Sequence, residues 1–212
     1  MSRCERIVYL VDDDFRIRES LAELLAAHGI PVMCFESAHD YLRHTRSDTE
    51  SCLILDLQLP GISGLELQQQ LSHEVGPPII FISGYGDIPC TVRAMKAGAF
   101  EFLPKPVDPV ALLAAVEGGL ARDSCLRDQI TVRHSLQRRF DHLTPREQQV
   151  LPLLLSGLRN KQSAWALGIS EVTLQVHRGH IMRKMAARSF AELVRMGETL
   201  GVRPAESVTG AA

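Results

Sequence analysis

Residues 7–14 read Ile-Val-Tyr-Leu-Val-Asp-Asp-Asp, an unbroken apolar run that ends in three carboxylates. Such a run is typical of a strand buried on both faces of a parallel sheet. A helical pattern follows it at residues 16–28, and the alternation recurs until about residue 121. The further apolar runs lie at 32–35, 52–56, 79–82 and 100–103, and the further helical patterns at 38–44, 65–73, 91–97 and 109–121. Five strand–helix units predict an α/β, flavodoxin-like (βα)5 fold with strand order 2-1-3-4-5.

The remainder of the chain has a different composition and predicts a second, all-α domain. We expect an α/β domain at 1–122, a helical linker at 123–141 that could continue the fifth helix, four helices at 142–200 and a flexible tail at 201–212. Residues 1–125 carry 10 Lys+Arg and 18 Asp+Glu, a net charge of −8, whereas residues 126–212 carry +6. The basic half is a candidate for binding phosphate backbones, with chance segregation of solvated charges as the alternative.

Several classes of protein are not favoured by the sequence. No apolar stretch approaches the roughly 18 residues that a membrane span needs, and residues 1–6 show no signal-peptide pattern. The five cysteines are scattered and odd in number, which indicates reduced thiols rather than a disulfide framework or a zinc site. We therefore expect a cytoplasmic protein without a membrane partner.

Carboxylates follow two strands that should be neighbours in the sheet. Asp12 and Asp13 follow the first strand, and Asp56 ends the third. Ligands of such sheets bind at the carboxyl ends of the strands, so these side chains should converge. Clustered carboxylates repel one another unless they are protonated or hold a cation, and hard oxygen ligands suit Mg²⁺. Asp14 is expected to be a solvated carboxylate at a helix start.

Two further strand ends supply a hydroxyl and an ammonium. Ser83 follows the fourth strand and Lys105 follows the fifth. A carboxylate, Mg²⁺, a hydroxyl and an ammonium around one point form a site for a transferring phosphoryl group. Asp56 would be the nucleophile, giving an acyl phosphate.

Residues 5–122 resemble the response-regulator receiver family. The resemblance is carried by Asp12-Asp13, by Asp56 with the following Leu-Gln-Leu-Pro-Gly-Ile-Ser-Gly, by Ser83-Gly84 and by Lys105-Pro106. It implies that Asp56 is the phosphorylation site. It also implies that Asp13 and Asp56 bind Mg²⁺ directly with the backbone carbonyl of Gln58, while Asp12 acts largely through water.

The same resemblance implies roles around the phosphoryl group. Ser83 and Gly84 would bind it together with Lys105, and the Lys105–Pro106 bond would be cis. Phe102 would be an aromatic switch that turns inward when Ser83 moves toward the phosphoryl group. For Phe102 alone, an ordinary core aromatic is the alternative.

The second half contains a helix–turn–helix pattern. Thr144 with Glu147 forms a capping box at the start of one helix. Further along, Gly168 makes a turn between a helix at about 161–167 and one that Ser170 caps, running to about Met185. Two helices joined by a short glycine-containing turn are typical of DNA-binding domains in which the second helix enters the major groove.

Residues 142–197 resemble the LuxR-type domain of the NarL/FixJ subfamily. The resemblance is carried by Leu-Thr-Pro-Arg-Glu at 143–147, Gly-Leu-Arg-Asn-Lys-Gln at 157–162, Leu-Gly-Ile-Ser at 167–170 and Val-His-Arg at 176–178. It implies a phosphate contact for Lys161, anchoring roles for Thr173 and Arg178, and base-edge positions for Gln175, Val176 and Gly179. We also expect Lys184, on the polar face of the same helix, to contact DNA. Ser163, where an apolar residue is usual, and Pro152, inside a helix, depart from the pattern.

Together these features predict a two-component response regulator that binds DNA. A histidine kinase would phosphorylate Asp56, and the chain would accept the phosphoryl group without being a turnover enzyme. Phosphorylation would promote a homodimer on two half-sites of double-stranded DNA, or release a DNA-binding face held against the receiver. The alternatives are a phosphorylation-independent DNA-binding protein with a vestigial receiver, and a phosphatase of flavodoxin-like fold.

Overall fold

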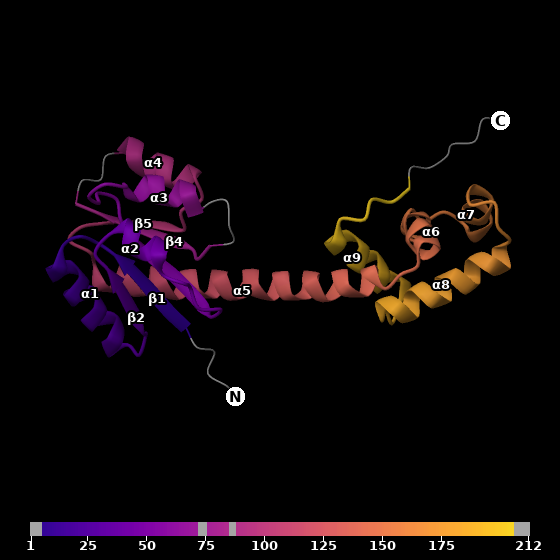
Figure 1. Cartoon of the computed structure of the whole chain (residues 1–212), viewed down its shortest axis with the longest axis horizontal. Coiled ribbons are helices and arrows are strands. Elements are labelled where there is room, and N and C mark those ends of the chain that lie inside the picture. Colours follow the sequence, from indigo (N-terminus) through magenta and orange to yellow (C-terminus); the bar gives the residue numbers. More distant parts are fainter. Residues whose placement is uncertain (1–5, 72–75, 85–87, 206–212) are drawn as a thin grey trace. The chain divides into compact units, whose positions relative to one another are not determined.

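The computed structural model describes residues 6–71, 76–84 and 88–205 of the chain (Figure 1). A parallel sheet has the order β2-β1-β3-β4-β5, which confirms the predicted topology. The strands are β1 (Arg6–Val11), β2 (Val32–Phe35), β3 (Glu50–Asp56), β4 (Ile79–Ser83) and β5 (Glu101–Pro104). The helices between them are α1 (Phe15–Ala27), α2 (Ala38–Arg43), α3 (Gly64–Leu71) and α4 (Ile88–Lys96). The predicted end of the third helix at His73 lies outside the described residues.

Both faces of the sheet are buried, which explains the unbroken apolar runs of its strands. Val8 and Leu10 of β1 pack in one core cluster with residues of α1 and α5 (Pro109–Asp141). Tyr9 and Val11 point to the opposite face and pack with residues of α2, α3 and α4. Alternation of side chains along a strand thus supplies two cores from one apolar segment.

Helix α5 continues well beyond the sheet. It runs for 33 residues and includes the whole predicted linker, so the linker is helical and continuous with the fifth helix. The chain divides into two compact units at Arg127 and Asp128. Buried Asp123 ties α5 to the first unit, since its Oδ2 accepts from the Ser51 backbone N–H (2.8 Å) and from Arg127 Nε (2.7 Å).

The second unit contains the end of α5 and the helices α6 (Pro145–Leu155), α7 (Asn160–Ala166), α8 (Glu171–Met185) and α9 (Phe190–Leu200) around one apolar core. The predicted caps Thr144 and Ser170 accept hydrogen bonds from the first turns of α6 and α8, and Ser189 does the same for α9. Pro152 lies inside α6, and its carbonyl accepts from the Ala205 N–H (3.0 Å), which holds the chain after α9 against α6. Among the described residues, no helix is both long and apolar enough to cross a membrane.

Candidate functional site

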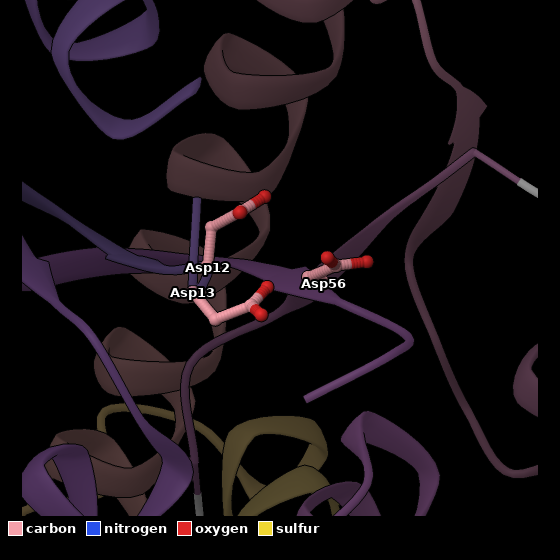
Figure 2. Close-up of side chains that lie close together, drawn as sticks. All are labelled: Asp12, Asp13 and Asp56. Atoms are coloured by element: carbon pink, nitrogen blue, oxygen red, sulfur yellow. The ribbon is translucent and has the colours of Figure 1, made fainter. Parts of the chain in front are cut away.

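The carboxyl ends of β1 and β3 bring the predicted acidic residues together. Val11 pairs with Leu55 in the sheet, so the next residues, Asp12 and Asp56, lie at one edge, both buried. One carboxylate oxygen from each of Asp12, Asp13 and Asp56 can be chosen so that all lie within 4.8 Å of one another. Figure 2 shows the three carboxylates at these neighbouring chain segments.

Lys105 reaches this acidic cluster from the end of β5. Its Nζ donates to Asp12 Oδ2 (2.7 Å) and to Asp56 Oδ2 (2.8 Å). The Lys105–Pro106 peptide bond is cis, as predicted, and the Lys105 backbone N–H donates to the Ser83 carbonyl (2.7 Å). One lysine therefore joins the ends of β1, β3, β4 and β5.

Burial and the lysine act in opposite directions on the acidic cluster. Burial raises the pKa of Asp12, and the hydrogen bond from Lys105 offsets this only in part. For Lys105, burial acts to lower the pKa, but the hydrogen bonds to Asp12 and Asp56 outweigh it, so its pKa lies above the ordinary value. Lys105 therefore stays a cation at neutral pH.

The donor set fits Mg²⁺. Three carboxylates supply hard oxygen ligands, and a site that is partly open to solvent leaves positions for water. Asp56 Oδ1 accepts from the Gln58 backbone N–H (3.2 Å), and Asp12 Oδ1 accepts from the Asp14 backbone N–H (2.9 Å). Gln58 is thus at the site, where its carbonyl is the predicted further ligand. Asp14 caps α1 by accepting from the Arg16 N–H, which confirms its position at a helix start.

The predicted switch residues lie on β4, β5 and the turn after β4. Ser83 is buried at the end of β4, and a Cβ added at Gly84 would meet open space. Phe102 of β5 is half-buried, with its ring centroid 6.4 Å from that of Phe81. Their roles in switching stay predictions.

Gly64 is the last residue of the motif that follows Asp56, and the sequence alone did not predict a role for it. The structure places it at the start of α3, where its N–H donates to the Leu57 carbonyl (3.0 Å). A Cβ at this position would clash with the Asp56 carbonyl oxygen and lie 3.1 Å from the Phe81 ring. Glycine at position 64 therefore lets α3 pack directly against the backbone that carries Asp56.

In the second unit, α7 and α8 form the predicted helix–turn–helix. Gly168 between them has a φ of +64°, a left-handed conformation that favours glycine. Of the predicted base-edge residues, Gln175, Val176 and Gly179 are all exposed on α8, and a Cβ added at Gly179 would meet open space. At these positions, no side chain of the described protein would keep α8 from entering the major groove of DNA.

The residue predicted to contact a DNA phosphate lies on α7, and the two predicted to anchor the recognition helix lie on α8. Lys161 is exposed in the first turn of α7. Thr173 Oγ1 lies 2.8 Å from Ser170 Oγ at the start of α8, and the Arg178 guanidinium lies 4.8 Å from the centroid of the Phe190 ring. The contacts of Thr173 and Arg178 suit their predicted anchoring roles.

Lys184 forms an ion pair within the second unit that the sequence did not predict. Its Nζ donates to Glu147 Oε2 (2.6 Å), which also accepts from the Thr144 backbone N–H (2.7 Å). Burial acts to raise the pKa of Glu147, but the hydrogen bonds from Lys184 and Thr144 lower it more, to about 2. The Lys184 ammonium is therefore held by a buried carboxylate between α6 and α8, and its contact with DNA stays a prediction. The sequence separation of 37 residues hid this pair.

Ser163 and Trp165 of α7 differ in their burial. Ser163 is buried at 1% exposure, and its Oγ has no hydrogen-bond partner within the described part of the chain. Trp165 is 77% exposed. The position at which an apolar residue was expected is thus buried, with a hydroxyl in it.

The fold and both sites define a two-domain response regulator with a receiver and a helix–turn–helix. The family described as the response regulator receiver domain matches residues 8–117, and the luxR family of bacterial regulatory proteins matches residues 141–197. The chain belongs to the response regulators of the NarL/FixJ subfamily. It is therefore a transcription regulator, for which a histidine kinase and DNA are the partners that its two domains imply.

Relatives align along nearly the whole chain. Nodulation protein W of Bradyrhizobium diazoefficiens is 48% identical, covering 92% of this chain and 87% of its own length. Transcriptional regulatory protein FixJ of Azorhizobium caulinodans is 42% identical, covering 95% and 96%. The solved structure of response regulator StyR is 50% identical with a TM-score of 0.78, covering 92% of this chain and 98% of its own.

Proposed function

We propose that Asp56 accepts a phosphoryl group from a histidine kinase and that this modification controls DNA binding by α8. The observation that supports the proposal is the pair of hydrogen bonds from Lys105 Nζ to Asp12 and Asp56. A cation is already positioned beside the nucleophile, where the charge of a transferring phosphoryl group develops.

In the transfer, a carboxylate oxygen of Asp56 attacks the phosphorus of a phosphohistidine. The P–N bond breaks, its electron pair stays on the imidazole nitrogen, and an acyl phosphate forms on Asp56. A Mg²⁺ ion held by Asp12, Asp13, Asp56 and the Gln58 carbonyl would neutralise charge on the phosphoryl oxygens. Lys105 would exchange its bond to Asp56 for one to a phosphoryl oxygen, and Ser83 would donate to another.

The modified receiver would then act on the second unit through contacts that differ between the two states. Ser83 and Phe102 would rearrange, and either two receivers would pair or the DNA-binding face would be released. Pairing would place two α8 helices on half-sites about one helical turn apart. We expect the protein to act in the cytoplasm and to hold one phosphoryl group per chain rather than turn over a phosphodonor.

The test compares wild type with Asp56→Asn, each incubated with Mg²⁺ and acetyl phosphate. Intact mass should show one added phosphoryl group on the wild type and none on the variant. Molecular mass in solution then separates the two routes, since only pairing moves the wild type toward a dimer. A wild-type chain that takes up no phosphoryl group would show a vestigial receiver, and continuous release of inorganic phosphate would show an enzyme.

A further inference from the structure

A basic hollow lies beside the C-terminal end of α8, where the last turns of α5 pass it. The described residues that line it are Ser135, Arg138, Arg139, His142 and Lys184. All of them belong to the second unit, and no carboxylate is among them. A concave surface lined by cations attracts anions, because the fields of the positive side chains add.

Two of these cations already have partners within the protein. Arg139 Nη1 donates to the Met185 carbonyl (3.1 Å) at the end of α8, and Lys184 is held by Glu147. The exposed Arg138 guanidinium has no hydrogen bond or ion pair within residues 6–71, 76–84 and 88–205. The neighbouring carboxylate of Asp141 accepts from Gln137 Nε2 (2.8 Å) instead. Arg138 is therefore available to an external anion.

The hollow lies on a flank of the proposed recognition helix. Val176, Gly179 and Arg183 are exposed on one side of α8. Successive residues of an α-helix are about 100° apart, so Lys184, which lines the hollow, lies roughly 100° around the helix from Arg183. When one side of a helix faces base edges in the major groove, its flanks face the phosphates of the two strands.

We infer that Arg138, with His142 beside it, binds a DNA backbone phosphate next to the groove that α8 enters. The inference rests on the proposed DNA binding by α8, and it makes the last turns of α5 part of the DNA interface. The contact is independent of sequence, since a phosphate carries no base information. Lys161 at the start of α7 is the predicted phosphate contact of the helix–turn–helix itself, and Arg138 adds one near the other end of α8.

The salt dependence of DNA binding tests the inference with Arg138→Gln. Each phosphate contact that is lost reduces the slope of log K against log salt concentration by about 0.9. The probe is a mixed-sequence duplex of roughly 30 base pairs, or three helical turns. Full-length chains are titrated between about 50 mM and 200 mM salt at a fixed Mg²⁺ concentration. Arg133→Gln is the matched control, because Arg133 is exposed on the same helix but does not line the hollow.

Arg138→Gln should bind with a slope about 0.9 smaller in magnitude than the wild type, and Arg133→Gln should keep the wild-type slope. Arg138→Lys should keep it too, because the charge is retained. Equal slopes for wild type and Arg138→Gln would overturn the inference, as would an equal loss in Arg138→Gln and Arg138→Lys, which would indicate a structural role. A wild-type chain that fails to bind the duplex at the lowest salt, both with and without acetyl phosphate, would instead refute the proposed DNA binding.

Discussion

Replacing Lys184 with Met is expected to destabilise the second unit by about 2–3 kcal/mol. Removing one partner of a fully buried ion pair costs roughly 3–5 kcal/mol, because the other charge stays buried. The Glu147 side chain is only 3% exposed, but that of Lys184 is 34% exposed, so water compensates part of the loss. Urea unfolding read by the exchange of backbone amide hydrogens in α6 and α8 reports on this unit.

The effect of Lys184→Met should depend on pH in a defined direction. The folded-state pKa of Glu147, about 2, lies below its ordinary value of 4.5. Its stabilising contribution is therefore complete above about pH 4.5 and is lost as the pH falls toward 2. The difference in unfolding free energy between wild type and Lys184→Met should shrink across that window.

Two further variants make the reasoning refutable. Lys161→Met removes an exposed lysine of the same unit and should change the unfolding free energy by less than about 0.5 kcal/mol. The double variant Glu147→Gln with Lys184→Met should recover most of the loss, because the amide leaves no buried charge and its oxygen still accepts from the Thr144 N–H. A Lys184→Met effect that is independent of pH, or as small as that of Lys161→Met, would refute the assignment of this ion pair.

Four other outcomes are expected. Mg²⁺ titrations should give weaker binding at pH 5 than at pH 7, because burial raises the pKa of Asp12 and protons compete with the ion. Asp12→Asn should reduce this dependence of Mg²⁺ affinity on pH. Ser163→Ala should stabilise the second unit by about 1 kcal/mol in urea unfolding, because it removes a buried hydroxyl without a partner. Ser170→Ala should destabilise the same unit by a similar amount, because it removes the N-cap of α8. Gly64→Ala should slow the uptake of phosphate from acetyl phosphate, measured by intact mass, because its Cβ displaces the Asp56 backbone; an unchanged rate would contradict this.

The sequence predicted the parts of the fold that local physical chemistry determines. Apolar runs identified the strands, and the right-handed crossovers restricted their order. Thr144, Ser170 and Ser189 cap helices through bonds to residues three positions away, so a short motif reveals them. The convergence of Asp12 and Asp56 followed from the neighbouring positions of β1 and β3.

Contacts between distant residues of the second unit could not be predicted in this way. Lys184 follows the exposed Arg183 and looks polar, and only the packing of α6 against α8 shows that it reaches Glu147. The bond from Ala205 to the Pro152 carbonyl is equally hidden, since it joins the chain after α9 to the middle of α6. The sequence did hold a signal for the Lys184–Glu147 pair, because Ile181 and Met185 mark the buried side of α8 next to position 184.

The uneven charge of the two halves bears on how phosphorylation can act. The first 125 residues already carry a net charge of −8. An acyl phosphate dianion replaces a carboxylate and adds only about one negative charge, at a site that holds Lys105 and is suited to a divalent cation. Such a change is small beside the existing charge, and salt screens it beyond roughly 10 Å. Electrostatic repulsion between the modified receiver and DNA would therefore change the affinity for DNA only slightly. The proposed switch would instead work through contacts that differ between the two states, which is the property that paired receivers or a released α8 would supply.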